Sequence, residues 1–343
     1  MRKHLSLLLA LVLILGGFSS VFAVPLMGSE RLENIDIVPE KDENEEVRVI
    51  VELVDEPAIA QASGKYTELP ESTRNRLEKD ILAAQEAVKN DLSRKGIVMD
   101  YINSFSVAFN GFSGTVKKYD IEAIKKNPNV KNVYISNKYE RPIVTPDMNG
   151  SYEMIGNREI WGADGYNGEG MVAAIIDTGI DPSHQDMKIT NAEPKLTKQS
   201  VEEKIASEHL PGKFYTDKVP YGYNYFDMNN TITDIDPAPH GMHVAGTVAA
   251  NGDIENGGIK GVAPEAQLLA MKVFSNDPDF PSTFDDIYMA AIDDAIKLGV
   301  DVINMSLGSS ASFYVPGNPI DKMITEARKN GVLFSISAGN SAH

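Results

Sequence analysis

Residues 171–179 have the sequence Met-Val-Ala-Ala-Ile-Ile-Asp-Thr-Gly, in which an apolar run ends at a carboxylate, Asp177. Three more apolar runs follow, at residues 267–274, 300–307 and 332–337. Helical patterns fit between the runs, at about residues 240–250, 285–298 and 320–329. Continuous hydrophobicity is typical of strands that are covered on both faces of a sheet. The pattern therefore predicts an α/β fold with a doubly wound, mostly parallel sheet.

Polar residues lie at or near the ends of three of these predicted strands. Asp177 follows the first run, Ser306 lies near the end of the third, and Asn340 follows the fourth. Parallel strands bring their carboxyl ends to one edge of the sheet, where the ligands of such domains bind. We therefore expect these three positions to contribute to one site.

A smaller unit is expected ahead of the α/β domain, over residues 47–139. Its pattern gives a strand, a helix, two strands, a helix and a strand, with the clearest segments at residues 47–53, 72–94, 105–109, 120–126 and 130–136. The strand at 105–109 is inferred from the alternation of Phe105, Val107 and Phe109 with small or polar residues. This order of elements is typical of a small α+β open-faced sandwich.

The remaining segments complete the predicted domain organisation. Residues 1–23 combine basic residues, an apolar run and a small-residue ending, which predicts a signal peptide cleaved after Ala23 and a secreted or cell-surface location. Residues 24–46 form an acidic, poorly patterned segment, and residues 140–150 are turn-rich, as in an exposed linker. The α/β domain is expected over residues 151–343.

Composition disfavours or excludes several classes of function. The formal net charge of −17 does not suit binding to a phosphate backbone, so we expect no nucleic-acid partner. The 343 residues include no cysteine, which excludes disulfides, thiol catalysis and thiolate metal ligands. Acidic loop residues could supply oxygens to a structural calcium ion, although no EF-hand spacing occurs and the metal site stays unassigned. These residues are Asp181, Asp186, Asp234 and Asp236.

Two motifs carry groups that are suited to proton transfer. Asp177 lies in Ile-Ile-Asp-Thr-Gly, and His240 opens His-Gly-Met-His-Val-Ala-Gly. A serine hydroxyl becomes a nucleophile when a histidine accepts its proton, a carboxylate orients that histidine and fixed donors bind the oxyanion. Asp177, His240 and Asn340 supply an orienting group, a base and an oxyanion donor in that order along the chain.

Each motif also has an alternative interpretation. Asp-Thr-Gly marks aspartic proteases, but these need two such triplets or a homodimer, and the sequence contains one. His240 and His243 could form a metal pair, but zincin helices place histidines four positions apart with an intervening Glu. One of the two histidines could instead be a packed structural residue. The combination of motifs favours serine protease chemistry.

These motifs resemble those of the subtilisin-like serine proteases, the subtilase or peptidase S8 family. Met242 in the histidine motif resembles the cell-envelope, lactocepin-like members. The smaller unit resembles an inhibitor I9-like propeptide, so the resemblance extends over nearly the whole chain after the signal peptide. It implies that Asp177 orients His240 as the base and that Asn340 binds the oxyanion. It also implies that the substrate contacts Ser306, Leu307, Gly308, Ser337, Ala338 and Gly339.

The nucleophile is the point at which the sequence departs from this family pattern. The family carries its serine in a Gly-Thr-Ser-Met-Ala-type turn after the Asn, and only Ser341, Ala342 and His343 follow Asn340. Ser310 precedes Asn340 and is not followed by a helical pattern. We therefore expect a secreted endopeptidase precursor that is truncated before its serine. The alternative is a catalytically dead peptide-binding protein or a truncated gene product.

The resemblance also implies the partners and cofactors of the enzyme. Its substrates would be proteins or peptides, and its own propeptide would act as an intramolecular inhibitor and folding aid. No cofactor would be required, with calcium as a possible structural ion.

Overall fold

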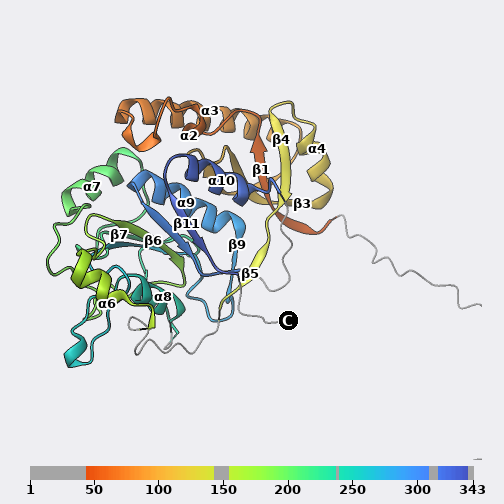
Figure 1. Cartoon of the computed structure of the whole chain (residues 1–343). Helices are drawn as coiled ribbons and strands as arrows, with labels where there is room; N and C mark the ends of the chain where they lie inside the picture. The colour runs from red at the N-terminus through yellow and green to blue at the C-terminus, as the bar shows by residue number, and fades with distance from the viewer. Residues whose placement is uncertain (1–43, 143–153, 237–238, 309–315, 339–343) are drawn as a thin grey trace, which may run out of the picture. The chain divides into compact units, whose positions relative to one another are not determined.

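The computed structural model describes residues 44–142, 154–236, 239–308 and 316–338, all within one compact unit of the chain, Glu43–His343 (Figure 1). The predicted signal peptide lies outside these ranges, as do Ser310, Gly339 and Asn340. Within the ranges, no helix combines the length and the apolar character needed to cross a membrane.

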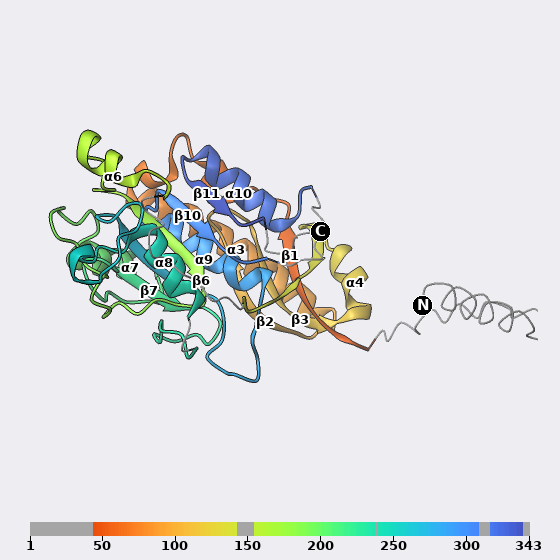
Figure 2. The same ribbon diagram turned by 60° about the horizontal axis from the view of Figure 1, so that its bottom comes forward.

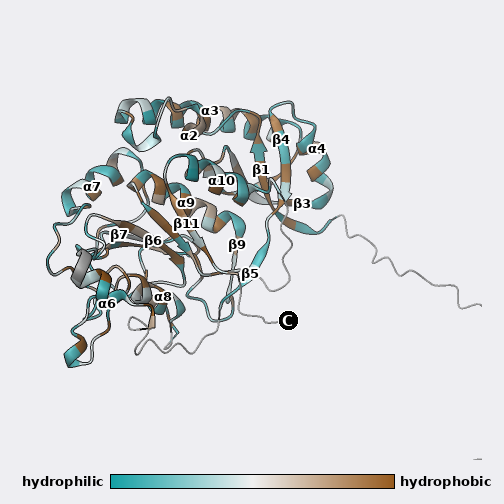
Figure 3. Ribbon diagram, viewed as in Figure 1, coloured by the Kyte–Doolittle hydropathy of each residue, from teal (hydrophilic) through white to brown (hydrophobic). Residues whose placement is uncertain are grey.

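The larger sheet contains five strands in the order β11-β10-β6-β8-β7, and every neighbouring pair is parallel. The strands are β6 (Val172–Asp177), β7 (Tyr221–Asn224), β8 (Gln267–Lys272), β10 (Val302–Met305) and β11 (Leu333–Ile336). All residues of β6 and β8 are buried, which explains the apolar runs 172–176 and 268–271 within them. Figure 3 shows hydrophobic residues running along the strands of this sheet.

Helices cover both faces of the larger sheet. They are α7 (Lys198–Ser207), α8 (His240–Ala249), α9 (Asp285–Leu298) and α10 (Pro319–Lys329). Ala173 and Ile175 of β6 belong to one core cluster with Ala245 of α8, which lies beside β6 in Figure 2. Ala174, on the opposite face, belongs to another cluster with Ile292 of α9. The predicted doubly wound α/β fold is confirmed.

The smaller sheet contains four antiparallel strands in the order β2-β3-β1-β4. Its elements are β1 (Glu46–Leu53), α3 (Glu71–Arg94), β2 (Met99–Phe105), β3 (Gly111–Lys117), α4 (Ile121–Lys125) and β4 (Val130–Ile135). Val49 and Val51 pack in one cluster with Val88 of α3, whereas Ile50 belongs to the cluster that contains α9. The sheet is therefore covered by its own helices on one face and by the α/β domain on the other.

The two sheets are joined through helices and a short strand pair. Helices α9 and α10 lie between the larger sheet and the smaller unit (Figure 1). Strand β5 (Lys138–Glu140) pairs antiparallel with β9 (Ser282–Phe284), so the end of the smaller unit extends along the α/β domain. Helices that the sequence pattern did not indicate are α2 (Ala58–Gln61), α6 (Asn157–Glu159) and α7.

The predicted strand at residues 105–109 is wrong. Strand β2 ends at Phe105, and the chain then leaves the sheet before β3 begins at Gly111. The backbone N–H groups of Ser106, Val107 and Ala108 donate to the carboxylate of Asp293 rather than to a neighbouring strand. The carboxylate of Asp293 thus takes the place of a neighbouring strand as hydrogen-bond acceptor. The alternation of apolar and polar residues in the sequence cannot distinguish the two kinds of acceptor.

Candidate active site

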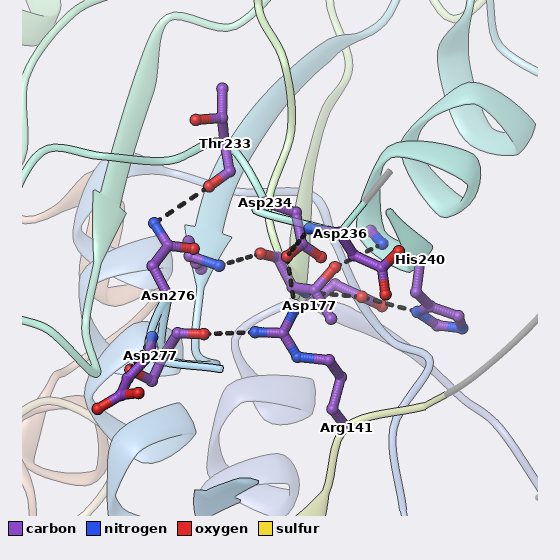
Figure 4. Close-up of polar contacts among 12 residues, drawn as sticks. Arg141, Asp177, Thr233, Asp234, Asp236, His240, Asn276 and Asp277 are labelled. Carbon is purple, nitrogen blue, oxygen red and sulfur yellow. Dashed lines mark hydrogen bonds and ion pairs between the residues drawn. The ribbon is translucent and has the colours of Figure 1, made fainter. Parts of the chain in front are cut away.

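Asp177 and His240 lie together at the carboxyl edge of the larger sheet. Asp177 is the last residue of β6 and His240 is the first residue of α8. His240 Nδ1 lies 2.7 Å from Asp177 Oδ1, and the two side chains are 11% and 1% exposed. Figure 4 shows this pair with Asp234 and Arg141 next to Asp177. The structure therefore brings together the two residues that the motifs indicated as orienting group and base.

Two glycines permit this approach of helix to strand end. A Cβ on Gly241 would lie 2.5 Å from the carbonyl oxygen of Gly179, and Gly179 has a φ of 134°. At this close approach, the Gly241 N–H donates to Thr178 Oγ1 at 3.0 Å. The absent Cβ atoms allow α8 to begin directly against the turn that follows Asp177, which fixes where His240 stands.

Burial dominates the electrostatics of Asp177. Burial raises the pKa of Asp177, while the hydrogen bond and charge of His240 and the Thr178 N–H act in the opposite direction. The Thr178 N–H donates to Oδ1 at 2.7 Å, and Oδ2 has no hydrogen-bond partner among the residues that the structure describes. A carboxylate with so few competing donors is suited to hold the Nδ1 proton of His240 and leave Nε2 free for proton transfer.

The expected substrate segments follow neighbouring strands of the same sheet. Ser306, Leu307 and Gly308 come after β10, which lies between β6 and β11. Ser337 follows β11, where its N–H donates to the Met305 carbonyl oxygen at 3.2 Å and its Oγ donates to the Leu307 carbonyl oxygen at 3.4 Å. The structure thus places Ser337 beside the 306–308 segment, and Ala338 follows it in the chain. Gly339 and Asn340 lie outside the described residues, so their placement stays a prediction.

Lys272 is a buried charged residue near this site that the sequence analysis did not identify. It ends β8, and its Nζ donates to the carbonyl oxygen of Thr178, next to Asp177. Burial lowers the pKa of Lys272 to about 8, although the nearby carboxylates of Asp234, Asp227 and Asp177 oppose the shift. The sequence did contain a signal for this residue, because Lys272 lies in an otherwise apolar run. A lysine buried there needs hydrogen-bond acceptors or carboxylates nearby.

The acidic residues considered for calcium do not gather into one cluster. Asp181 Oδ1 accepts from the N–H and hydroxyl of Ser183, and Asp186 Oδ2 accepts from the Ile259 N–H. Asp234 instead pairs with Arg141. Within the described ranges no group of three or more His, Cys, Asp or Glu residues is arranged to hold a metal ion. A structural calcium ion stays an untested expectation.

The chain matches two protein-family models. The subtilase family model matches residues 168–343, and the peptidase inhibitor I9 model matches residues 48–142. Among solved structures, fervidolysin from Fervidobacterium pennivorans is similar with a TM-score of 0.52 and 19% identity, covering 87% of this chain and 40% of that one. The epidermin leader peptide processing serine protease of Staphylococcus aureus has a TM-score of 0.51 and 17% identity, covering 86% and 60%. These two likenesses concern the fold.

Curated relatives are considerably longer than this chain. The PII-type proteinase of Lacticaseibacillus paracasei is 41% identical over 266 residues, which is 76% of this chain and 14% of that protein. The minor extracellular protease Vpr of Bacillus subtilis is 30% identical over 336 residues, covering 94% of this chain and 36% of that protein. The chain therefore spans a small part of the relatives that it matches.

Proposed function

Since the chain belongs to the subtilase family of serine proteases and carries an I9-type inhibitor region, we propose that it is the front part of a secreted endopeptidase precursor that uses Asp177 and His240. The observation that carries the proposal is the 2.7 Å contact between His240 Nδ1 and Asp177 Oδ1 at the carboxyl edge of the parallel sheet. Relatives named as proteinases, one of them extracellular, support both the activity and the export.

The proposed reaction is the hydrolysis of a peptide bond through an acyl-enzyme. A serine attacks the substrate carbonyl carbon while His240 Nε2 takes its proton and then delivers it to the leaving amine. Asp177 holds the Nδ1 proton and stabilises the imidazolium, and Asn340 donates to the oxyanion. Water then attacks the acyl-enzyme with the same histidine as base. These steps need no cofactor. We assign the serine to a later part of the protein, because residues 1–343 contain no Gly-Thr-Ser-Met-type turn.

The contacts of the smaller unit support its proposed role as an intramolecular inhibitor and folding aid. Asp293 of α9 accepts three backbone N–H groups of residues 106–108, at 2.9, 3.0 and 2.9 Å. Asp286 of the same helix accepts from Arg48, Ser113 and Ser136. An inhibitor that binds through buried carboxylates of the α/β domain can stabilise that domain while β5 occupies the strand edge at β9.

The test is hydrolysis and active-site labelling by the full-length protein after release of the I9 region. We expect casein cleavage and labelling by a fluorophosphonate probe, with kcat lowered roughly 10⁶-fold in His240→Ala. His209→Asn is the matched control, because His209 is exposed and its φ of 54° is tolerated by Asn. A protein that binds casein peptides yet neither cuts them nor reacts with the probe would instead be a peptide-binding pseudoenzyme.

A further inference from the structure

The guanidinium of Arg141 occupies an enclosed acidic site beside the Asp177–His240 pair. Arg141 Nη1 donates to Asp234 Oδ1 at 2.5 Å, and Nη2 donates to the carbonyl oxygen of Ser275. The side chain of Arg141 is 11% exposed and that of Asp234 is 1% exposed. Figure 4 shows the guanidinium reaching from the chain below Asp177 toward Asp234. An arginine of the inhibitor region is thus held in a site built by the α/β domain.

Arg141 reaches this site as part of an extended strand. Tyr139 pairs with Thr283 in the antiparallel β5–β9 register, and the backbone N–H of Arg141 continues it by donating to the Pro281 carbonyl oxygen at 2.7 Å. Main-chain hydrogen bonds along an edge strand accept any extended peptide, whatever its side chains. A substrate chain could therefore take the same course and carry a side chain into the same site.

The environment keeps Asp234 charged. Burial alone would raise the pKa of Asp234, but a hydrogen bond from Thr178 and the positive charges of Lys272 and Arg141 hold it below its usual range. Asp234 Oδ1 also accepts the Asp236 N–H at 3.2 Å, whereas Oδ2 has no hydrogen-bond partner in the described part of the chain. Arg141 thus shares Oδ1 with the Asp236 N–H, and Oδ2 is satisfied neither by Arg141 nor by the described residues of the α/β domain.

We propose that Asp234 and the Ser275 carbonyl form a substrate subsite for an arginine side chain, which Arg141 fills in the precursor. The inference rests on the proposed function, because it requires that the inhibitor strand and the substrate use the same edge of the domain. The two acceptors come from separate loops and engage two nitrogens of one planar guanidinium. A lysine ammonium is a single point donor and matches this geometry less well.

Departure of the inhibitor region gives the subsite its selectivity. Asp234 then loses the ion pair with Arg141 and keeps Lys272 as a positive neighbour. A buried carboxylate that loses one of its charged partners is less well stabilised, so a substrate arginine that restores the pair gains binding relative to a neutral side chain.

The experiment compares quenched peptides that differ only by arginine or citrulline at one position, scanned through the positions before the cut bond. Citrulline keeps the shape of the side chain and removes its charge. We expect one position at which arginine raises kcat/KM on the order of tenfold or more, with lysine in between. In Asp234→Asn the arginine-to-citrulline ratio at that position should fall toward one. Asp277→Asn is the matched control, because Asp277 is exposed on the loop after Ser275, and it should keep the ratio.

Three outcomes would overturn the subsite. One is equal kcat/KM for arginine and citrulline at every position in an enzyme that cuts casein. Another is an Asp234→Asn variant that lowers both rates and keeps their ratio. If casein is not cut at all, the proposed function fails separately. Binding of the labelled peptide pair to the protein after release of the I9 region, read by fluorescence anisotropy, then tests the subsite, and equal affinities would contradict it.

Discussion

Arg48 of β1 and Asp286 of α9 form a two-point ion pair across 238 positions of sequence, with Nε–Oδ1 at 2.7 Å and Nη2–Oδ2 at 2.9 Å. The Asp286 side chain is fully buried, and it also accepts from the hydroxyls of Ser113 and Ser136. One carboxylate at the start of α9 therefore binds three strands or strand ends of the inhibitor region. Removing a partner leaves part of a buried charge unpaired, which is more costly than losing an exposed pair.

Arg48→Ala is expected to weaken the hold of the inhibitor region on the α/β domain by about 2 kcal/mol, or roughly 30-fold in affinity. The measurement is the onset of activity after the precursor is cut, which should come earlier in the variant. Arg76→Ala is the matched control, because Arg76 forms an exposed pair with Asp80 on α3 and should leave the onset unchanged. Equal onset in Arg48→Ala and wild type would show that the pair contributes little.

Asp293→Ala should affect the same interface more strongly. The change leaves three backbone N–H groups of residues 106–108 without their acceptor, and these residues lie in the core. Each unsatisfied buried donor costs about 1–3 kcal/mol, so we expect little stable precursor at all. The yield of folded precursor and its resistance to added protease measure this. Asp279→Ala, at an exposed loop position, is the control, and equal yields of the two variants would contradict the argument.

The sequence predicted the buried sheet well because burial on both faces leaves a local signature. The runs that became β6 and β8 needed no knowledge of their partners, and Asp177 and His240 were found through motifs that include the glycines behind their close approach. Strand β3 was harder to predict, because Gly111 and Gly114 interrupt its pattern of apolar residues. Both glycines lie where β3 passes close to the backbone of a neighbouring strand. A Cβ on Gly111 would lie 2.1 Å from the Val51 carbonyl oxygen.

The contacts around the site could not be predicted in the same way. Arg141 fell in a segment that looked like an exposed linker, yet its side chain is mostly buried against a residue 93 positions away. Asp234 was considered only as a calcium ligand, because a carboxylate in a loop carries no local sign of its partner. Such ion pairs depend on how loops distant in sequence pack together, and the hydrophobic periodicity of the sequence does not predict them.

Gly241→Ala is expected to impair catalysis through the position of His240. The new methyl would meet the Gly179 backbone at 2.5 Å, so α8 must shift away from the turn that follows Asp177. A displacement of about 1 Å at a catalytic group can cost roughly 100-fold in rate. Gly246→Ala in the same helix is the control, since its Cβ would meet only Ile259 Cδ1 at 3.4 Å. We expect kcat to fall in the first variant and to be retained in the second, and retention in both would mean that the close approach does not position His240.

Glu265 gives the α/β domain a stability that depends on acid pH. Its carboxylate accepts from the Thr190 hydroxyl and N–H and from Asn251 Nδ2, and so ties down the loop at 190–192. Burial alone would raise the pKa of Glu265, but these hydrogen bonds lower it from 4.5 to about 2. Because the folded pKa lies below the ordinary value, the stabilisation is fully present above pH 4.5 and is lost as the pH falls toward 2.

Glu265→Gln should therefore lower the free energy of unfolding at pH 7 by about 2 kcal/mol and flatten its fall between pH 5 and pH 3. Urea unfolding of the native protein at several pH values measures both effects. Glu255→Gln, at an exposed position, is the matched control and should follow the wild-type curve. If Glu265→Gln loses stability equally at pH 7 and pH 3, the loss comes from packing rather than from the ionised carboxylate. In that case the hydrogen bonds to Thr190 and Asn251 do not depend on its charge.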